Sequence, residues 1–183
     1  LKGLYNRLDA WLSGQAVQLA TGAPLEDLLV YINKFPGLQR RMEQIVPNLY
    51  SDYAHTVEKI RGAMSTALEL ANEDGQDLVV VYEGLTNKRQ YFIMNDYKDV
   101  FSGAAQLYWV PSYLAREDPL QRVLPPEELI MRLSDPSFAL PAELNDDLKR
   151  TIQAHLTKGD LVVAMSGGGG GSLDEWLRKE FVA

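Results

Sequence analysis

The amino-acid sequence predicts an α/β protein built on a mostly parallel sheet, with a layer of helices on each face. Three apolar runs of strand length, each bounded by polar residues, occupy positions 77–82, 106–110 and 161–165. Uninterrupted runs of this kind are typical of parallel strands that are buried on both faces. Helix-like stretches separate the runs, and this alternation favours right-handed crossovers and a three-layer, Rossmann-like architecture, preceded by a short helical segment.

The size and charge of the chain exclude several classes of protein. With 183 residues, 46% of them hydrophobic, the chain can form one large domain, or one domain plus a fragment of another. A net charge of −7 without any basic run argues against nucleic-acid binding. The absence of cysteine removes disulfides and thiolate chemistry, and no apolar run is long enough to span a membrane. Because the sequence begins with Leu1 and has no signal peptide, we expect it to be part of a longer protein.

Residues 1–34 have the periodicity of two helices. The first is interrupted at Gly14 and ends at Gly22, and its apolar stripe comprises Leu4, Leu8, Trp11 and Leu12. The second opens at Pro24, whose fixed φ suits a first helical turn. A DNA-binding helix–turn–helix would need basic residues on this second helix, where Glu26 and Asp27 stand instead.

The first candidate site follows this helical pair. After a turn come the basic residues Arg40 and Arg41, a short strand-like run at 49–53, and a helix that begins near His55. Asp52 and His55 therefore lie at the end of a strand and the start of a helix, where α/β proteins bind ligands. From spacing alone, Asp52 could equally cap the helix, and the two arginines could equally be a solvated pair at a hinge.

The remaining elements follow from the same patterns. A polar loop at 83–90 leads into a helix that reaches about residue 103, and Pro111 ends the second apolar strand. Further helices are predicted at 126–133, 146–156 and 173–181. His155 has no Asp, Cys or Ser at a suggestive spacing and is interpreted as structural or exposed. Two histidines without any cysteine predict no metal cluster.

A run of five glycines, Gly167–Gly171, separates the last strand from the last helix. The run could be an engineered flexible linker, but it occurs once and lies between a strand and a helix, which favours native sequence. No Lys-Ser or Lys-Thr follows it, as a Walker phosphate loop requires. We therefore expect these glycines to let the backbone pass close to a neighbouring loop or substrate.

Two motifs resemble those of a known family. The run Gly37-Leu38-Gln39-Arg40-Arg41-Met42-Glu43, followed by Asp52-Tyr53-Ala54-His55, is similar to the start of the C-terminal domain of the Mur ligases. These ATP-dependent enzymes add amino acids to UDP-N-acetylmuramic acid during peptidoglycan synthesis. Within the family, the chain is most similar to the alanine-adding and murein-peptide-recycling members.

The resemblance implies a division into domains, a reaction and a set of partners. Residues 1–35 correspond to the helical end of the central, ATP-binding domain, with Asn6 near an asparagine of the family, and residues 36–183 correspond to the C-terminal domain. The full enzyme is expected to be cytoplasmic and to use ATP and Mg²⁺. Its expected partners are a UDP-N-acetylmuramate-type substrate, an amino acid or peptide, and the rest of the same chain, without nucleic acid or membrane. The chain alone is expected to be inactive, because it contains no Walker phosphate loop.

The resemblance also implies roles for individual residues. Those expected on the nucleotide side of the cleft are Arg40, Arg41, Asp52, Tyr53 and His55. A guanidinium can hold phosphate oxygens through two parallel hydrogen bonds, and family position favours Arg41 over Arg40 for this role. One departure from the family is Val57, which stands where a proline usually follows the histidine by two residues.

The incoming amino acid or peptide is expected to contact a second group of residues, which are Arg89, Arg116 and Glu117. Alanine-adding members have Pro-His here with an arginine four residues later, whereas this chain has Gly84-Leu85 before Arg89. Arg116 and Glu117 lie in a run similar to the family's Tyr-Ala-Ala-Arg-Glu segment, although a charged surface loop would have the same composition. These departures favour the alternative function, a non-catalytic Rossmann-like binding module.

Overall fold

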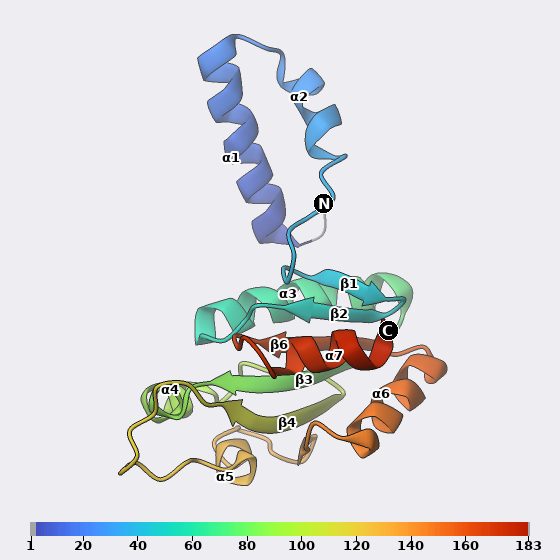
Figure 1. Ribbon diagram of the computed structural model, residues 1–183. Helices are drawn as coiled ribbons and strands as arrows, with labels where there is room; N and C mark the ends of the chain where they lie inside the picture. The colour runs from blue at the N-terminus through green and yellow to red at the C-terminus, as the bar shows by residue number, and fades with distance from the viewer. Residues whose placement is uncertain (1–2, 183) are drawn as a thin grey trace.

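A computed structural model describes residues 3–182 and shows a helical hairpin joined to a sheet domain (Figure 1). The helices, in chain order, are α1 (Leu4–Thr21), α2 (Leu25–Ile32), α3 (Val57–Asp74), α4 (Asn87–Ile93), the 3₁₀ turn η1 (Met94–Asp96), α5 (Pro126–Ile130), α6 (Asp146–Lys158) and α7 (Leu173–Phe181). The strands are β1 (Glu43–Val46), β2 (Leu49–Asp52), β3 (Leu78–Leu85), β4 (Gln106–Tyr113), β5 (Ala139–Pro141) and β6 (Leu161–Ser166).

The strands form a single sheet in the order β1-β2-β6-β3-β4-β5. Every neighbouring pair is parallel except β1 and β2, which form an antiparallel hairpin at one edge. The predicted α/β class with a mostly parallel sheet is therefore confirmed. Two short edge strands, β1 and β5, were not predicted, because β1 is polar at Glu43 and Gln44 and β5 has only three residues and ends in proline.

Alternate side chains of the central strands point to opposite faces of the sheet and build two cores. On one face, α3 and α5 cover a cluster that includes four aromatic rings with centroids 4.9–6.3 Å apart: Tyr82, Tyr97, Phe101 and Trp109. On the other face, α6 and α7 cover Val79, Val81, Val162 and Ala164 with Ile152 and Leu177. The sheet thus lies between two helical layers (Figure 1).

Two residues expected to interrupt elements do not interrupt them. α1 is continuous through Gly14, whose added Cβ would lie 3.0 Å from a methyl of Leu25 and 3.4 Å from one of Ile32, so the glycine allows α2 to pack closely. β4 continues past Pro111 to Tyr113, because its register against β3 shifts in this region. A proline is tolerated in a strand at such an irregularity, where its missing N–H breaks no ladder bond.

Several boundaries also differ from the predictions. β3 extends to Leu85, beyond the apolar run, since the polar Glu83 finds buried partners at the end of the strand. α3 begins at Val57 rather than near His55, and α4 ends at Ile93, so the segment before Gly103 is mostly turns. α5 has five residues, three fewer than the predicted 126–133.

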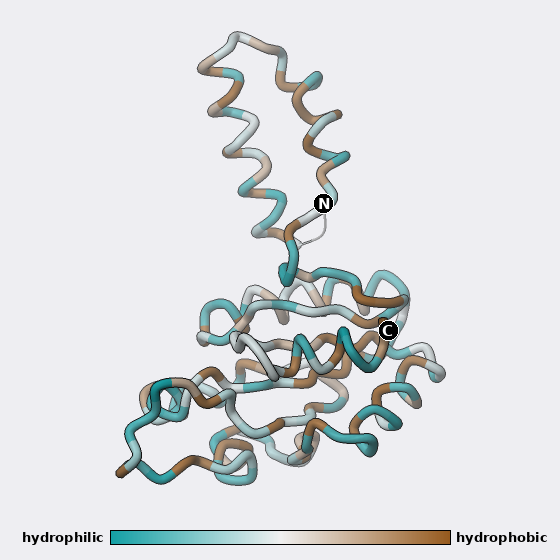
Figure 2. Tube along the Cα trace, viewed as in Figure 1, coloured by the Kyte–Doolittle hydropathy of each residue, from teal (hydrophilic) through white to brown (hydrophobic). Residues whose placement is uncertain are grey.

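α1 and α2, here called the helical arm, project from the sheet domain (Figure 1). Arg7 of α1 joins the arm to α3 through two hydrogen bonds to Glu69, at 2.5 and 3.2 Å. Figure 2 shows hydrophobic residues, in brown, along both helices of the arm, and many of these residues are exposed. The exposed apolar side chains include Leu4, Tyr5, Leu8, Trp11, Leu12, Val17, Leu19, Val30 and Tyr31. An apolar surface of this extent is unusual for a side of a protein that faces water.

Candidate functional site at the carboxyl edge of the sheet

The carboxyl ends of β2, β6 and β3 bring three polar residues to one edge of the sheet. Asp52 ends β2, Ser166 ends β6, and Glu83 lies near the end of β3, and all three are buried. β6 is inserted between β2 and β3 although it comes last in sequence. Because ligands of open α/β sheets bind outside the carboxyl ends of strands where the strand order reverses, this edge is the candidate site.

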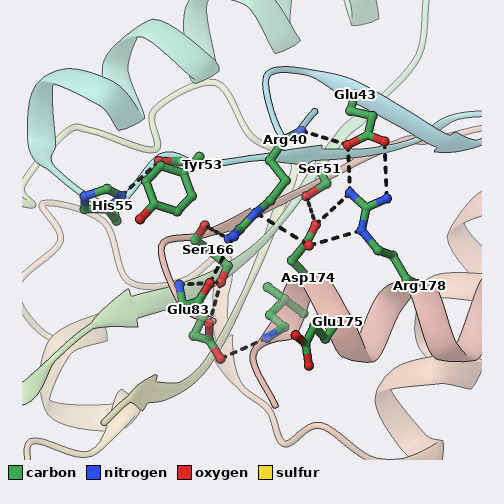
Figure 3. A network of polar contacts seen from close by, with 12 residues as sticks. Arg40, Glu43, Ser51, Tyr53, His55, Glu83, Ser166, Asp174, Glu175 and Arg178 are labelled. Atoms are coloured by element: carbon green, nitrogen blue, oxygen red, sulfur yellow. Dashed lines mark hydrogen bonds and ion pairs between the residues drawn. The ribbon is translucent and has the colours of Figure 1, made fainter. Parts of the chain in front are cut away.

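A buried carboxylate, Asp174, lies at the centre of a polar network on this edge (Figure 3). It accepts a hydrogen bond from Ser51 Oγ at 2.5 Å and two from Arg178, at 3.1 and 3.2 Å. Arg178 also donates to both oxygens of Glu43, and Arg40 Nε lies 3.5 Å from Asp174 Oδ2. The network joins α7 to β1, β2 and the segment before β1.

Glu83 links β3 to the start of α7. Its carboxylate accepts hydrogen bonds from Ser166 Oγ at 2.5 Å and from the backbone N–H of Leu173 at 3.0 Å. It therefore serves the first turn of α7, where the side chain of Ser172 makes no capping bond. Burial raises the pKa of Glu83, although the hydrogen bonds from Ser166 and Leu173 oppose the shift.

The close approach predicted for the glycine run is present at its first two positions. A Cβ on Gly167 would lie 2.6–2.8 Å from atoms of His55, and one on Gly168 would lie 2.6 Å from Ser172 and 2.8 Å from Tyr113. Gly170, in contrast, has no neighbour closer than 3.9 Å to such a Cβ. The start of the loop is therefore packed between β2, β4 and α7.

Replacing Gly168 by alanine should lower the free energy of unfolding by about 1–3 kcal/mol, the usual cost of overpacking a closely packed site. The added methyl group has no room beside Ser172 and Tyr113. Gly170→Ala is the matched control and should change stability by less than about 0.5 kcal/mol, as other surface substitutions do. Denaturant unfolding of both variants measures the difference, and equal stabilities would contradict the packed arrangement.

The adjacent arginines of the basic pair point to different places. Arg40 is partly buried, and its guanidinium donates to the carbonyls of Ser166 and Gly168, at 2.7 and 3.0 Å. Arg41 is exposed, and its side chain forms no hydrogen bond or ion pair with the described residues 3–182. Arg40 and Met42 both have positive φ, 56° and 46°, so the chain turns sharply on each side of Arg41.

A cavity of about 1010 Å³ separates the helical arm from α3, and we call it the arm cavity. Arg41, Lys59 and Asp52 line it from the sheet domain, and Asn6 lines it from α1. The other lining residues are Tyr5, Asp9, Ala10, Ser13, Tyr31, Ile32, Phe35, Gly37, Leu38, Met42, Glu58, Gly62, Ala63 and Thr66. The cavity combines apolar walls with two cations, three carboxylates (Asp9, Asp52 and Glu58) and further hydrogen-bonding groups, and apolar walls with a few polar groups are usual for a small-molecule site.

Asp52 does not cap α3. Its carboxylate accepts the backbone N–H of Met42 at 2.9 Å, and the residue at the N-cap of α3 is Thr56. Burial raises the pKa of Asp52, while the backbone hydrogen bond from Met42 and the charge of Arg41 oppose the shift. Asp52 therefore holds the turn before β1 and also faces the arm cavity.

Tyr53 and His55 lie between the arm cavity and the glycine run. Three cations surround the Tyr53 ring: the guanidinium carbons of Arg40 and Arg41 lie 4.6 and 5.8 Å from its centroid, and Lys59 Nζ lies at 5.4 Å. His55 Nδ1 lies 2.9 Å from the Tyr53 carbonyl, so this nitrogen carries the proton and donates. Burial and the charge of Lys59 lower the pKa of His55 to about 4. The imidazole is thus neutral at pH 7, with Nε2 left as an acceptor.

Arg89 lines a second, smaller pocket of about 470 Å³, here called the α4 pocket. Lys88 and Phe92 line it from α4 and Val57 lines it from α3, with Thr56, Glu58, Thr86, Ile93 and Asp96 completing the wall. Two cations, two carboxylates (Glu58 and Asp96) and an apolar wall suit a ligand that carries a carboxylate, an amine and an apolar group.

The two other residues expected near the acceptor occupy the loop after β4. Glu117 accepts the backbone N–H groups of Lys88 and Ala115, at 3.3 and 3.0 Å, and so holds this loop against α4. Arg116 has a positive φ of 57° and does not line the α4 pocket. Arg89 and Glu117 are therefore brought near α4, whereas Arg116 is not placed in the pocket.

A packing relation explains the glycine at position 84. A Cβ at this position would lie 2.7–2.8 Å from the side-chain amide of Gln90, so Gln90 occupies the space that a larger residue would need. Gln90 also accepts a hydrogen bond from Tyr97 at 2.5 Å. Where the alanine-adding members have Pro-His, this chain therefore has Gly84-Leu85, and the side chain of Gln90 occupies the space beside Gly84.

His155 has partners that its sequence spacing did not suggest. Its Nδ1 lies 2.7 Å from Asp160 and its Nε2 lies 3.0 Å from the Tyr108 hydroxyl, at the edge of the sheet opposite the site. Asp160 is five residues away but follows the end of α6, where the chain turns back. These contacts agree with the interpretation of His155 as structural, and its aspartate partner stands at a spacing that the sequence analysis did not consider suggestive.

Sequence reasoning missed several residues of this edge, namely Glu43, Ser51, Lys59, Glu83, Ser166, Asp174 and Arg178. Only Glu83, a carboxylate continuing an apolar strand, carried a visible signal. Within residues 3–182, no three histidine or carboxylate side chains gather in a way that could hold a metal ion. None of the helices in this described part combines the length and apolar character needed to cross a membrane.

In sequence and in fold, the chain matches the C-terminal domain region of Mur ligases, and the resemblance predicted from the two motifs is confirmed. In particular, UDP-N-acetylmuramate–L-alanine ligase from Rickettsia canadensis is 23% identical over 99% of this chain, and that from Rickettsia typhi is 25% identical over 91%. The chain spans 39% and 34% of the length of these two relatives. No family model matches it.

Solved structures share the fold over nearly the whole chain. UDP-N-acetylmuramate–alanine ligase from Thermotoga maritima aligns with a TM-score of 0.68 at 20% identity over 98% of this chain. A murein peptide ligase from Psychrobacter arcticus gives 0.58 at 22% identity over 100%, and folylpolyglutamate synthase from Mycobacterium tuberculosis, complexed with ADP, gives 0.60 at 17% over 92%. Each alignment covers 37–38% of the longer structure.

Proposed function

We propose that this chain is the C-terminal part of a cytoplasmic, ATP-dependent ligase that adds an amino acid or peptide to UDP-N-acetylmuramate in peptidoglycan synthesis or recycling. The names of the relatives support the reaction class, and the fold match supports the position within the ligase. The observation that carries the proposal is the arm cavity, which holds Arg41 and Asp52 of the two family motifs together with Asn6.

The arm cavity is proposed to bind the nucleotide. Arg41 has no ion-pair partner among the described residues, and Lys59 lines the same wall, so both cations are available to phosphate oxygens. Asp52 can accept hydrogen bonds from sugar hydroxyls, since a carboxylate has several lone pairs and only part of them are used by backbone N–H groups. Arg40 is engaged elsewhere and is proposed to contribute indirectly.

The α4 pocket is proposed to hold the incoming amino acid or peptide. Arg89 and Lys88 would bind its carboxylate, and Phe92 and Val57 would contact an apolar group. In the chain, His55 lies between Asp52 of the arm cavity and Thr56 of the α4 pocket, and we propose that its Nε2 accepts a hydrogen bond from the amine of the acceptor. Glu117 would keep the loop after β4 in place, and we propose no direct contact for Arg116.

In the proposed reaction, a substrate carboxylate attacks the γ-phosphate of ATP and releases ADP, giving an acyl phosphate. The amine of the acceptor then attacks the acyl carbon, forming the amide and releasing phosphate and a proton. Mg²⁺ would neutralise the phosphate charge, but the described residues bring no ligand set together for it, so it is assigned to the rest of the ligase. This chain would orient the nucleotide and acceptor and exclude water from them.

The helical arm is proposed to be the end of the central domain, and residues 36–183 the C-terminal domain. The exposed apolar surface of the arm supports this division, because such a surface is usually covered by more protein. The alignments to relatives about two and a half times as long also support it. We therefore expect the chain alone to show no ligase activity.

The test is phosphate release by the full-length protein with Mg-ATP and UDP-N-acetylmuramate, across a panel of amino acids and murein peptides. Arg89→Ala should raise the KM for the acceptor by about tenfold or more, since a charge-assisted hydrogen bond contributes about 1.5–3 kcal/mol. The KM for ATP should change by less than about twofold, because only the acceptor contact is lost. Arg132→Ala, an exposed arginine outside both pockets, is the control.

Phosphate release that depends on one acceptor would support the ligase and identify its substrate. No release with any acceptor, from a protein that is folded by circular dichroism, would overturn the proposed function. The substitutions at Val57, Gly84 and Leu85 would then favour a Rossmann-like binding module, which direct nucleotide-binding measurements would detect.

A further inference from the structure

The segment 37–42, which joins the helical arm to the sheet, has two sides with different contacts. Gly37, Leu38, Arg41 and Met42 all line the arm cavity. Gln39 and Arg40 do not line it, and the side chain of Arg40 points towards the loop that follows β6 (Figure 3). One short segment therefore touches both the proposed nucleotide site and the glycine run.

Arg40 is held at both its backbone and its side chain. Its N–H donates to Glu43 at 2.7 Å, and its carbonyl accepts from the N–H of Tyr53 at 2.8 Å. Its guanidinium donates to the carbonyls of Ser166 and Gly168 and lies 3.5 Å from Asp174. A planar guanidinium can hold several acceptors at fixed directions, so movement of this segment must displace the loop or break these bonds.

The loop that Arg40 holds is in contact with His55, which is proposed to bind the amine of the acceptor. Gly167 packs directly against the His55 ring, and Gly168 packs against Tyr113, at the end of β4. Gly168 and Ser166 supply the two carbonyls that Arg40 binds. A shift of the loop would therefore move the packing surface on which His55 rests.

We propose that Arg40 is a positioning residue that couples occupancy of the arm cavity by a nucleotide to the conformation of the glycine loop 166–172. A bound nucleotide holds the segment 37–42 through Arg41, and Arg40 transmits that restraint to the loop beside His55. The two adjacent arginines thus have separate tasks, binding by Arg41 and coupling by Arg40. The coupling rests on the proposed nucleotide site.

Hydrogen exchange of the full-length protein tests this assignment. Without nucleotide, Arg40→Met should speed amide exchange in residues 166–172 by about tenfold or more, because two charge-assisted hydrogen bonds are lost. Arg41→Met, the matched control, should leave exchange in that loop unchanged. Arg40→Lys should restore only part of the protection, since an ammonium cannot reproduce the fork of a guanidinium, and it serves as the second variant if Arg40→Met does not fold.

A non-hydrolysable ATP analogue should slow exchange in both segments, 37–42 and 166–172, in the wild type, and only in 37–42 in Arg40→Met. In turnover assays, Arg40→Met should lower kcat while the KM for ATP stays within about twofold. Unchanged loop exchange in Arg40→Met, or equal protection of its loop by the analogue, would overturn the coupling. If the analogue does not change amide exchange in residues 37–42 of the wild type, the proposed nucleotide site in the arm cavity is wrong, and the coupling is overturned with it. Faster loop exchange in Arg40→Met without nucleotide would then show only that Arg40 holds the loop in place.

Discussion

Replacing Arg41 by methionine in the full-length protein should raise the Kd for ATP by about 10- to 100-fold, the value of one or two charge-assisted hydrogen bonds. Methionine keeps an unbranched, flexible side chain, although a shorter one, and removes the charge and all donors. Stability should change little, because Arg41 is exposed and its side chain has no ion pair among residues 3–182. Isothermal titration with ATP or ADP measures the loss directly.

Arg61→Met is the matched control for this experiment. Arg61 is an exposed arginine of α3 that does not line the arm cavity, so its removal changes the net charge equally without removing a proposed contact. Nucleotide affinity should remain within about twofold of the wild type, since a single exposed charge acts weakly through solvent. Equal losses in Arg41→Met and Arg61→Met would mean that the cavity does not contact the phosphates. An unchanged affinity in both would assign the nucleotide to another site.

Replacing Asp174 by alanine should lower the free energy of unfolding by about 2–4 kcal/mol, the largest effect on stability among the substitutions proposed. Asp174 is buried, and its loss leaves Ser51 and the charges of Arg40 and Arg178 without their shared acceptor. Removing one partner of a fully buried ion pair costs about 3–5 kcal/mol. The expected loss is smaller here because Arg178 keeps its ion pair with Glu43. Urea or guanidinium unfolding, with circular dichroism as the probe, gives the difference in unfolding free energy.

Asp147→Ala is the control for the loss of a carboxylate. Asp147 forms an ion pair with Arg150 on the exposed side of α6, where such a pair contributes between about 0 and 1 kcal/mol. If both variants lose the same small amount of stability, the buried network does not stabilise the fold. A loss confined to Asp174→Ala would support the network as the connection between α7 and β2.

The stabilisation by Asp174 should also depend on pH in a defined direction. Burial alone would raise the pKa of Asp174, but hydrogen bonds from Arg178 and Ser51 and the charge of Arg40 lower it below its ordinary value of 3.8. A depressed carboxyl pKa adds stability above the ordinary value, and that stability is lost as the pH falls through the folded-state pKa. The difference in unfolding free energy between wild type and Asp174→Ala should therefore be constant from pH 5 to 7 and decrease below pH 3.8. A difference that increases on acidification would contradict the predicted direction.

The class of the fold could be predicted from the amino-acid sequence alone. The apolar runs of β3, β4 and β6 and the periodicity of the helices are local patterns, so burial on both faces could be read from neighbouring residues. The motifs at 37–43 and 52–55 indicated the family, and they lie at the cavity that the structure shows. Local signals failed at Gly14, where close packing against α2 favours a glycine within the helix, and at Pro111, where an irregular register between β3 and β4 tolerates a proline.

Which of the two adjacent arginines lines the arm cavity and which one binds the glycine loop depends on the three-dimensional fold. Arg40 and Gly168 are 128 residues apart, and Ser51 and Asp174 are 123 apart, so no local pattern relates them. These pairs meet because β6, the last strand in sequence, inserts between β2 and β3 and brings the glycine loop beside the start of the sheet. The insertion itself follows from the need to bury the apolar strand β6 on both faces, a requirement that the sheet satisfies as a whole.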